Sequence, residues 1–319
     1  MEVSLYISNF RIDIMKKLFT YIILVLLGVG VIDSIFSLVI EKVVPQRKLV
    51  AFQESSCDIA IFGDSRAIHH YNPLILSDSL RCSSNVFGFW GQNIYYHYAM
   101  LNTLLDYSKT KPKVVLLELS AIDVNNTPGW NTEKLNLLFP YFYSDSIVRE
   151  LLSEVLDKEE LSFVVASGLY RHNSKIIPYL RNAFEDTFIG FKPLKKEWKE
   201  PIKKSDKELG SQIDYMKVKY IEKFIELCRK ENLTLIFTVS PKYVLLSKEH
   251  WKEKVKEIAN NNNIRLLDHE QDKYFLDHRE LFKDLLHLNE KGANIYSRII
   301  AKEITDMRDD YDSPGPPPV

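Results

Sequence analysis

The alternation of apolar and amphipathic stretches along the chain predicts a parallel sheet flanked by helices. Five short runs are apolar almost throughout, as expected of strands that are covered on both faces. These runs span residues 57–63, 84–90, 113–119, 234–240 and 264–269. Stretches with helical spacing follow them at residues 93–107, 206–231 and 248–260, and from a cap at Asn289 to about Met307. This order predicts an α/β fold with a doubly wound parallel sheet of five strands.

The interval from 125 to 204 interrupts this rhythm. It contains no run that resembles a buried strand, so we expect a helical insertion in the α/β domain. Its aromatic side chains have two interpretations, because they either line a substrate cleft or pack within the insertion. They are Trp130, Phe139, Tyr141, Phe142 and Tyr143.

The amino-terminal region has a pattern of its own. Residues 18–40 form a run of 23 residues with a single charge, Asp33. As a helix, the run reaches about 35 Å, enough to cross a hydrocarbon core of about 30 Å. No small-residue cleavage site follows it, which favours an uncleaved transmembrane signal anchor. Asp33 is costly in such a segment, and it either reaches the outer interface or faces a partner in the membrane.

The charges before the anchor predict its orientation. Arg11, Lys16 and Lys17 precede it, and the positive-inside rule then places the amino terminus in the cytoplasm. We therefore expect a single-pass protein of the cell membrane with an extracytoplasmic body. The expected divisions are a cytoplasmic amino terminus at 1–17, the anchor at 18–40, a juncture at 41–56, the α/β domain at 57–306 and a disordered tail at 307–319.

Composition and charge narrow the classes of function. The chain has 319 residues, of which 45% are hydrophobic and 27% charged, enough to bury a large core. Its formal net charge is −1 and no basic block interleaves with aromatic residues, which argues against binding to nucleic acid.

Cysteine usage indicates neither a disulfide scaffold nor a metal site. The three cysteines, Cys57, Cys82 and Cys228, lack the spacing of metal ligands, and we expect no metal and no cofactor. Neighbouring strands lie within disulfide distance of one another, but one residue of offset turns a side chain to the other face. A bridge between Cys57 and Cys82 and two separate thiols therefore both stay open.

The segment Gly63-Asp64-Ser65 directly follows the first predicted strand. Serine at such a position is either a helix cap or a nucleophile. In open α/β sheets, ligands bind beyond the carboxyl ends of the strands, which is where this serine lies. A serine hydroxyl is a poor nucleophile without a base, so the functional interpretation needs a histidine near the same edge of the sheet.

Asp284 and His287 supply such a pair after the fifth predicted strand. The histidine stands just before the helix cap at Asn289, and a carboxylate three residues earlier can curl back to hold its second ring nitrogen. Gly91 follows the second predicted strand, where a glycine lets a backbone N–H approach a substrate oxyanion closely.

Three segments resemble blocks of the SGNH/GDSL hydrolase superfamily. "IFGDSR", "FGFWGQN" and "DLLHLNEKGA" are similar to its first, second and fifth blocks, over residues 57–306. The resemblance implies a flavodoxin-like sheet, with Ser65 as nucleophile and first oxyanion donor. It further implies that Gly91 is the second donor, His287 the base and Asp284 its orienting partner.

The third block departs from the superfamily's pattern. That block is Gly-x-Asn-Asp, whose asparagine donates to the oxyanion, whereas this chain has "LLELSAIDVNN". Ser120, Asn125 and Asn126 are the residues that could substitute, and a missing donor costs about 2.7 to 4 kcal/mol of transition-state stabilisation. The chain also resembles the membrane-anchored branch of the superfamily, whose members act in O-acylation of cell-envelope polymers.

These features predict a membrane-anchored serine esterase or O-acyltransferase. The expected substrate is an acyl ester, with acetyl as the expected group, on an extracytoplasmic glycan, and the expected partner is a multi-spanning membrane acyltransferase. Trp90 and Tyr243 are candidate substrate contacts beside the predicted catalytic residues. The alternative is a catalytically weak or inactive module that binds glycan or a membrane partner.

Overall fold

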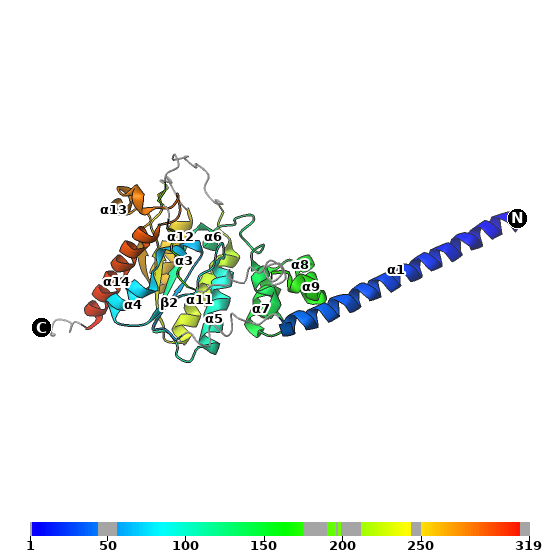
Figure 1. Cartoon of the computed structure of the whole chain (residues 1–319), viewed down its shortest axis with the longest axis horizontal. Helices are drawn as coiled ribbons and strands as arrows, with labels where there is room; N and C mark the ends of the chain where they lie inside the picture. The colour runs from blue at the N-terminus through cyan, green and yellow to red at the C-terminus, as the bar shows by residue number, and fades with distance from the viewer. Residues whose placement is uncertain are drawn as a thin grey trace. The chain divides into compact units, whose positions relative to one another are not determined.

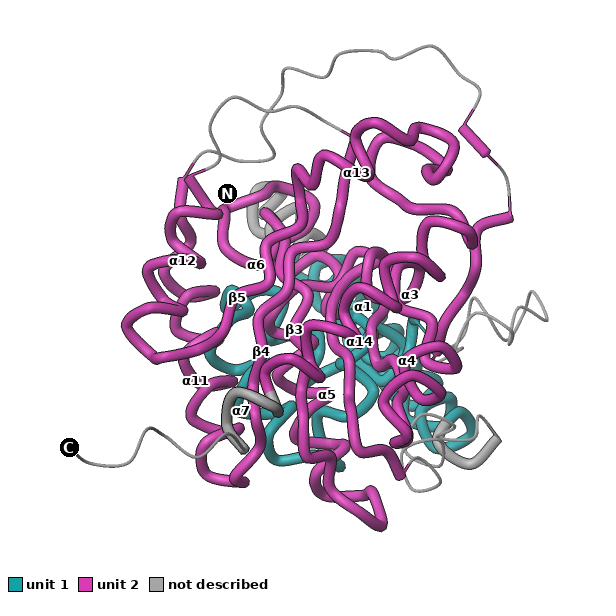
Figure 2. Tube along the Cα trace, turned by 90° about the vertical axis from the view of Figure 1, so that its left-hand side faces the viewer, with its two compact units in different colours: residues 1–45, 136–186 teal, residues 46–135, 187–319 magenta. Residues whose placement is uncertain are grey.

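The computed structural model describes residues 2–43, 56–174, 190–195, 197–198, 212–243 and 250–312. Contacts divide the chain into two compact units, residues 1–45 with 136–186 (unit 1) and residues 46–135 with 187–319 (unit 2), which Figure 2 colours separately. Most of the expected juncture, residues 44–55, and the last seven residues of the expected tail lie outside the described residues.

Unit 2 contains the predicted sheet. Its five strands are all parallel and follow the order β2-β1-β3-β4-β5. Their bounds are β1 Ile59–Phe62, β2 Ser84–Val86, β3 Val114–Glu118, β4 Thr234–Val239 and β5 Arg265–Asp268. β1 and β3 are buried along their whole length, which explains why their sequences are apolar without alternation. The prediction of a doubly wound α/β fold with a five-stranded parallel sheet is confirmed.

Helices cover both faces of this sheet, as Figure 1 shows with α4 and α14 on one side and α5 and α11 on the other. Tyr296 of α14 and Leu76 of α4 pack with Ile59 and Ile61 of β1 in one apolar core. The helices of this unit are α3 Ser65–His70, α4 Pro73–Leu80, α5 Ile94–Tyr107, α6 Ala121–Val124, α11 Tyr215–Lys230, α12 His250–Asn262, α13 Lys273–Leu276 and α14 Glu290–Asp312, with a 3-10 turn at Arg279–Leu281.

The cysteines of the first two strands are free thiols. Cys57 is buried and Cys82 is half-buried, and each lies two residues before the pair Ile59 and Ser84 that opens the register of β1 and β2. The register therefore brings the two thiols to the same end of neighbouring strands, without a bridge between them.

Unit 1 contains helices alone among its described residues. They are α1 Glu2–Val43, α7 Ser146–Val155, α8 Lys158–Ala166 and α9 Gly168–Arg171, with a 3-10 turn at Phe139–Tyr141. Phe139, Tyr141 and Phe142 are buried, in agreement with packing within the insertion, whereas Tyr143 is exposed.

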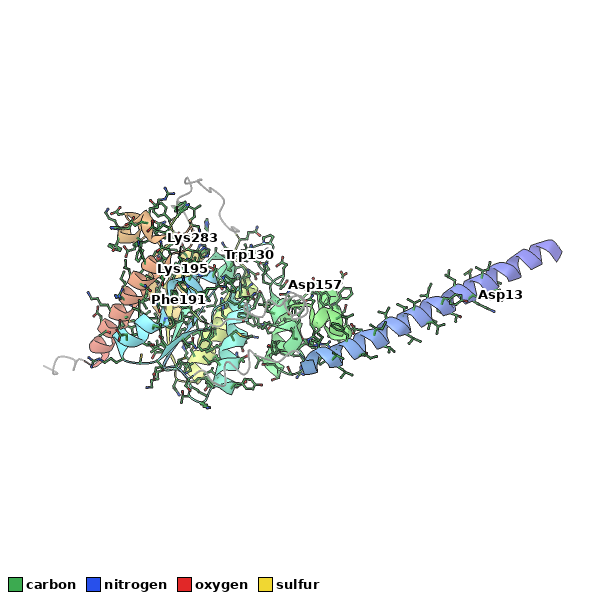
Figure 3. All side chains as sticks on the ribbon, viewed as in Figure 1. Asp13, Trp130, Asp157, Phe191, Lys195 and Lys283 are labelled. Carbon is green, nitrogen blue, oxygen red and sulfur yellow. The ribbon has the colours of Figure 1, made fainter. Side chains whose placement is uncertain are left out.

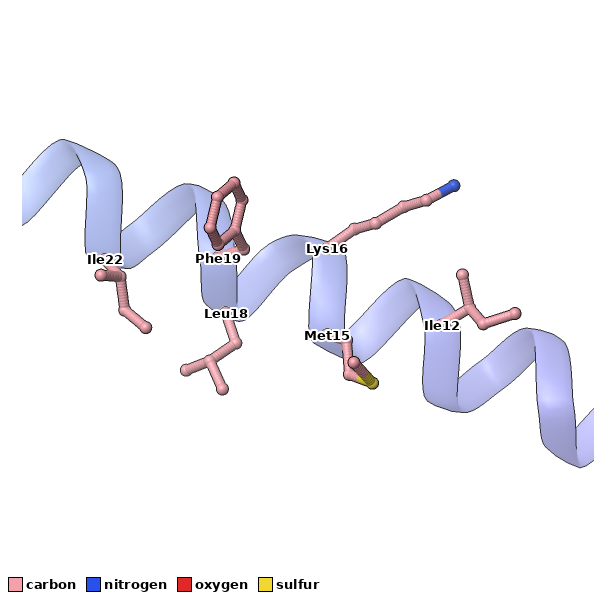
Figure 4. A pocket seen from close by; sticks show the side chains of 6 residues that line it. All are labelled: Ile12, Met15, Lys16, Leu18, Phe19 and Ile22. Carbon is pink, nitrogen blue, oxygen red and sulfur yellow. The ribbon is translucent and has the colours of Figure 1, made fainter.

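Helix α1 has the length and composition of a membrane span from Ile12 to Ile40. Asp13 lies near its amino end (Figure 3). Figure 4 shows how Ile12, Met15, Leu18 and Ile22 project from this helix, while Lys16 extends its amino group away from the axis. The predicted apolar helix is thus present.

Asp33 has partners within its own chain, which neither interpretation of this residue anticipated. Its carboxylate accepts hydrogen bonds from the hydroxyl of Ser167 at 2.7 Å and from the N–H groups of Gly168 at 2.6 Å and Leu169 at 2.8 Å. These three donors belong to the first turn of α9, which therefore docks on α1 within unit 1.

Candidate active site

The turn after β1 presents Ser65 at the start of α3. Gly63 has a φ of +152°, and a Cβ there would lie 2.7 Å from Cβ of Glu118, so only glycine fits. Asp64 caps α3 by accepting the N–H of Arg66 at 2.8 Å. Because Asp64 is the cap, the hydroxyl of Ser65 is left for another partner.

That partner is His287. The Oγ of Ser65 lies 2.8 Å from Nε2 of His287, and Nδ1 of the same ring lies 2.9 and 3.0 Å from the two carboxylate oxygens of Asp284. A carboxylate only accepts, so Nδ1 carries the proton and Nε2 accepts from the serine hydroxyl. The structure therefore brings Ser65, His287 and Asp284 together in the arrangement of a serine hydrolase triad.

The Asp-x-x-His spacing works through a tight local turn. Asp284 Oδ1 also accepts the N–H groups of Leu286 at 2.8 Å and His287 at 2.9 Å. Burial acts to raise the pKa of the Asp284 carboxyl, but the hydrogen bonds from His287 and Leu286 outweigh it and hold the pKa below its ordinary value. The carboxylate is thus kept ionised, as a group that stabilises an imidazolium must be.

A buried polar chain fixes the backbone beside the histidine. The N–H of Leu288 donates to Nε2 of His70 at 3.0 Å, and Nδ1 of His70 lies 2.7 Å from Oγ of Ser240. Ser240 in turn donates to Oε1 of Glu118 at 2.7 Å. His70 is fully buried. Sequence reasoning missed its role, and the only signal for it was its proximity to Ser65.

Glu118 anchors this chain at the carboxyl end of β3. Its side chain is fully buried, accepts from Tyr71 and Thr238, and lies 3.4 Å from the guanidinium of Arg66. Burial raises the pKa of Glu118, although the nearby guanidinium acts against that shift. Groups from β3, β4 and α3 are thus held together under the site.

The loop after β2 lies against the nucleophile turn. The N–H of Phe89 donates to the carbonyl of Gly63 at 3.1 Å, and a Cβ on Gly88 would lie 2.6 Å from the same oxygen. Gly91 follows with a φ of +62°, and a Cβ there would overlap the ring of Trp130. Within the described residues, the N–H groups of Ser65 and Gly91 have no acceptor. Both N–H groups are therefore candidates for binding a substrate oxygen.

Trp90 is connected to the candidate triad through the side chain of His69. Its indole N–H donates to Nε2 of His69 at 3.1 Å, and the His69 ring lies edge-on to the His287 ring at 5.4 Å between centroids. Nδ1 of His69 lies 2.7 Å from the carbonyl oxygen of Lys192, whose amino group lies 4.5 Å above the Trp90 ring. Burial lowers the pKa of His69, so a neutral imidazole lines this side of the site. Lys192 was not among the residues that the sequence singled out.

The structure gives Tyr243 and Asn125 partners away from Ser65. The N–H of Tyr243 donates to the carbonyl of Leu285 at 2.9 Å, and its ring packs against Trp198 and Phe282. Tyr243 therefore supports the loop that carries His287. Asn125 is buried at the end of α6, and its carbonyl accepts from the amino group of Lys217 at 2.7 Å. Burial lowers the pKa of that lysine to about 8.

Ser120, another of the three candidates for the third block, contacts the turn that carries Ser65. Its hydroxyl lies 3.1 Å from Oδ2 of Asp64 and 3.0 Å from Oδ2 of Asp123. It therefore braces the residue that caps α3. Among the described residues, no cluster of three or more His, Cys, Asp or Glu side chains could hold a metal ion.

No protein-family model and no curated protein sequence matches the chain. Several solved structures are similar to the chain at low identity and with TM-scores near 0.4. A protein described as lipolytic and of G-D-S-L family, from Desulfitobacterium hafniense, has a TM-score of 0.41 and 11% identity, covering 76% of this chain and 97% of its own. An acylhydrolase by description from Bacteroides fragilis has the same TM-score and identity, with coverages of 82% and 96%. An acetyl xylan esterase has a TM-score of 0.39 and 16% identity, with coverages of 78% and 98%.

The parallel sheet, the arrangement of Ser65, His287 and Asp284, and the three sequence blocks point the same way. The chain is an α/β protein with a candidate triad of Ser65, His287 and Asp284, and its three sequence segments resemble blocks of the SGNH/GDSL hydrolase superfamily.

Proposed function

We propose that the chain is a serine hydrolase that cleaves or transfers the acyl group of carboxylic esters. The observation that carries the proposal is the 2.8 Å contact between Oγ of Ser65 and Nε2 of His287, with Asp284 on the second ring nitrogen. A hydroxyl, a base and an orienting carboxylate in this order are what acyl transfer through serine requires.

The first half of the reaction forms an acyl-enzyme. Ser65 Oγ attacks the ester carbonyl carbon while Nε2 of His287 takes the hydroxyl proton. The negative charge moves to the carbonyl oxygen, which the N–H groups of Ser65 and Gly91 stabilise. When the tetrahedral intermediate collapses, the bond to the alcohol oxygen breaks, and the departing alcohol receives the proton from His287.

The second half decides between hydrolysis and transfer. Water or a sugar hydroxyl attacks the acyl-serine carbonyl, and His287 again takes the proton of the attacking group. His287 then returns this proton to the Oγ of Ser65 as the acyl-serine ester bond breaks. The same residues serve both outcomes.

We further propose that the substrate is an acyl ester, acetyl in the first instance, of a cell-envelope glycan outside the cytoplasm. Support comes from helix α1, whose candidate span Ile12–Ile40 contains the expected anchor at residues 18–40. Trp90, half-buried beside His69, and Trp130, more than a third exposed beside Gly91, offer aromatic faces on which a sugar ring can stack. Trp130 is labelled in Figure 3, together with Lys283, which precedes Asp284. A multi-spanning membrane acyltransferase is the proposed donor partner.

A fluorophosphonate probe, which reacts with an activated serine, tests the catalytic proposal. The parent chain should be labelled, Ser65→Ala should not, and His287→Ala should be labelled at least a hundredfold more slowly. Ser79→Ala, at an exposed serine of α4, is the matched control and should be labelled like the parent. A folded parent chain that never reacts would overturn the proposal and favour a module that binds glycan or a membrane partner.

A further inference from the structure

The exposed apolar surface of α1 has a counterpart on α8 and α9 in the same unit. Residues 161–170, "LSFVVASGLY", carry no charged side chain, whereas the three residues before them, Lys158 to Glu160, are all charged. Within this stretch Phe163 is 48% exposed, Val165 44% and Leu169 37%. Large apolar side chains gathered in this way mark an interaction surface.

This stretch is docked on one face of α1. Asp33, Ser37 and Ile40 follow one another at helical spacing, and they are partly or wholly buried while Ile35 and Leu38 are exposed. A Cβ on Gly168 would overlap the side chain of Ser37, so the two backbones approach closely there. Figure 1 shows α8 and α9 beside the carboxyl-terminal end of α1.

The length of α1 requires the bilayer to reach the part of the helix, from Asp33 to Ile40, on which α9 is docked. Lys16 and Lys17 set the near boundary, because a charged amino group is costly in hydrocarbon and lysines near the end of a span keep it at the interface. From Leu18 to Ile32, the last residue before Asp33, a helix spans only about 22 Å. A hydrocarbon core of about 30 Å therefore extends to about Leu38, past the docking site of α9. Tilting the helix would only shorten the thickness that it crosses.

The charged groups Asp33 and Arg171 at this level have partners within unit 1. The carboxylate of Asp33 has three donors from the start of α9. Arg171 donates to the carbonyl of Val164 at 2.8 Å and lies 4.7 Å above the ring of Tyr143. Satisfied groups of this kind are the condition under which irregular backbone is tolerated at membrane depth.

We propose that residues 161–170 are a second membrane-contacting element, which enters the bilayer beside the carboxyl end of α1. The proposal rests on the membrane anchor proposed above. Its occupant is the lipid itself: acyl chains near the headgroups cover Phe163, Val165 and Leu169. Tyr143, more than half exposed, lies where an aromatic ring favours the interface.

Tryptophan substitutions in the full chain test this depth. Leu24→Trp reports the membrane depth of the anchor, and Phe163→Trp and Val165→Trp report the depth of residues 161–170. Leu74→Trp, at a 79% exposed position of α4, is the matched control. Each variant is reconstituted in phosphatidylcholine vesicles whose acyl chains carry bromine, and the emission of the parent chain is subtracted. Bromines near the glycerol backbone should quench positions 163 and 165 at least half as strongly as deep bromines quench position 24. Position 74 should stay unquenched.

The outcomes separate this inference from the proposed function. Quenching at position 24 with none at 163 and 165 would overturn the inference and leave the anchor standing, with the bilayer thinned around a short span. An unquenched position 24 would overturn both. Labelling of Ser65 by the fluorophosphonate is independent of either result.

Discussion

His70 occupies the place where the catalytic loop meets the sheet. One ring nitrogen accepts the N–H of Leu288, next to the base, and the other contacts Ser240 at the end of β4. No atom of His70 is needed in the proposed reaction. Its effect is to hold the backbone from which the His287 ring projects, so it is a positioning residue.

Removing His70 should lower the rate of turnover more than it changes substrate binding. We expect His70→Ala to lower kcat for a small acetyl ester about a hundredfold with KM little changed, because a misplacement of about 1 Å costs about that much. His70→Gln keeps an acceptor and a donor and should recover part of the loss. Steady-state kinetics of the parent and both variants measure this.

The control for that experiment is His172→Gln, at a buried histidine of unit 1. It tests whether the loss of any buried imidazole slows the reaction. Equal kcat in the parent and His70→Ala would contradict the positioning role, and so would equal losses in His70→Ala and His172→Gln.

Burial of His70 also predicts how stability depends on pH. Burial lowers the pKa of His70 well below its ordinary value, and electrostatic interactions with His287 and Arg66 act in the same direction. The folded form stays neutral while the unfolded chain binds a proton near pH 6.5, so stability falls as the pH drops below about 6.5, by about 1.4 kcal/mol per pH unit. His69, whose pKa burial also lowers, adds to this slope.

Urea unfolding between about pH 7 and pH 5 measures this slope. His70→Gln should show a shallower loss of the free energy of unfolding than the parent. His269 acts with the opposite sign in both proteins: burial lowers its pKa, but the carboxylate of Glu303 outweighs burial and raises it. A variant with the same slope as the parent would contradict a neutral buried His70.

At the scale of elements, glycines let two loops meet at the nucleophile. Gly63 ends β1 and Gly88 follows β2, and a side chain on either would collide with the other loop or with β3. Gly91, further along the second loop, has both a positive φ and the ring of Trp130 against it. The proposed oxyanion site is therefore built from backbone that only glycine allows.

Gly91→Ala should lower both stability and kcat, because the new methyl group meets Trp130 and the backbone must leave its left-handed conformation. Gly91→Ala combined with Trp130→Ala removes the collision but not the backbone strain. We expect the double variant to recover stability relative to Gly91→Ala while kcat stays at least tenfold below that of Trp130→Ala. Thermal unfolding and ester turnover of all three check this. Recovery of both quantities would mean that the N–H of Gly91 does not bind the oxyanion.

The docking of α9 on α1 depends on Asp33. Asp33→Leu leaves the Ser167 hydroxyl and two backbone N–H groups without their acceptor, at a cost of about 1 to 3 kcal/mol for each buried group. We expect hydrogen exchange at residues 167–171 to quicken at least tenfold in detergent. Ser34→Leu, at the neighbouring exposed position, is the control and should exchange like the parent. Unchanged protection in Asp33→Leu would show that α9 is held by other contacts.

At the scale of the whole molecule, uninterrupted apolar runs explain why the sheet could be predicted. Each of the five runs contains a strand. In the run at 84–90 the strand ends at Val86, because the loop that contains Gly88 begins there. The helix expected from 206 begins at Tyr215, where Asp214 caps it. Residues 206–211 lie outside the described residues.

Some contacts of the candidate site arise from short sequence motifs and could be predicted, whereas others join distant segments and could not. Ser65 after a strand, and Asp284 three residues before His287, are local patterns that predicted their own geometry. The chain from His70 through Ser240 to Glu118 joins three distant segments, and hydrogen bonds between such segments leave no periodic trace in a sequence. The same holds for Asp33 and α9, 134 or more positions apart.

The separation of Ser65 and His287 by 222 positions has a consequence during translation, when the chain is still incomplete. During synthesis the proposed nucleophile leaves the ribosome early, whereas its proposed base arrives only after β5, shortly before the last helix, α14. Folding that proceeds from the amino terminus therefore yields an inert serine for most of translation. On the proposed function, a fragment that ends between residues 65 and 284 carries the serine without its base, so we expect a prematurely terminated chain not to attack esters.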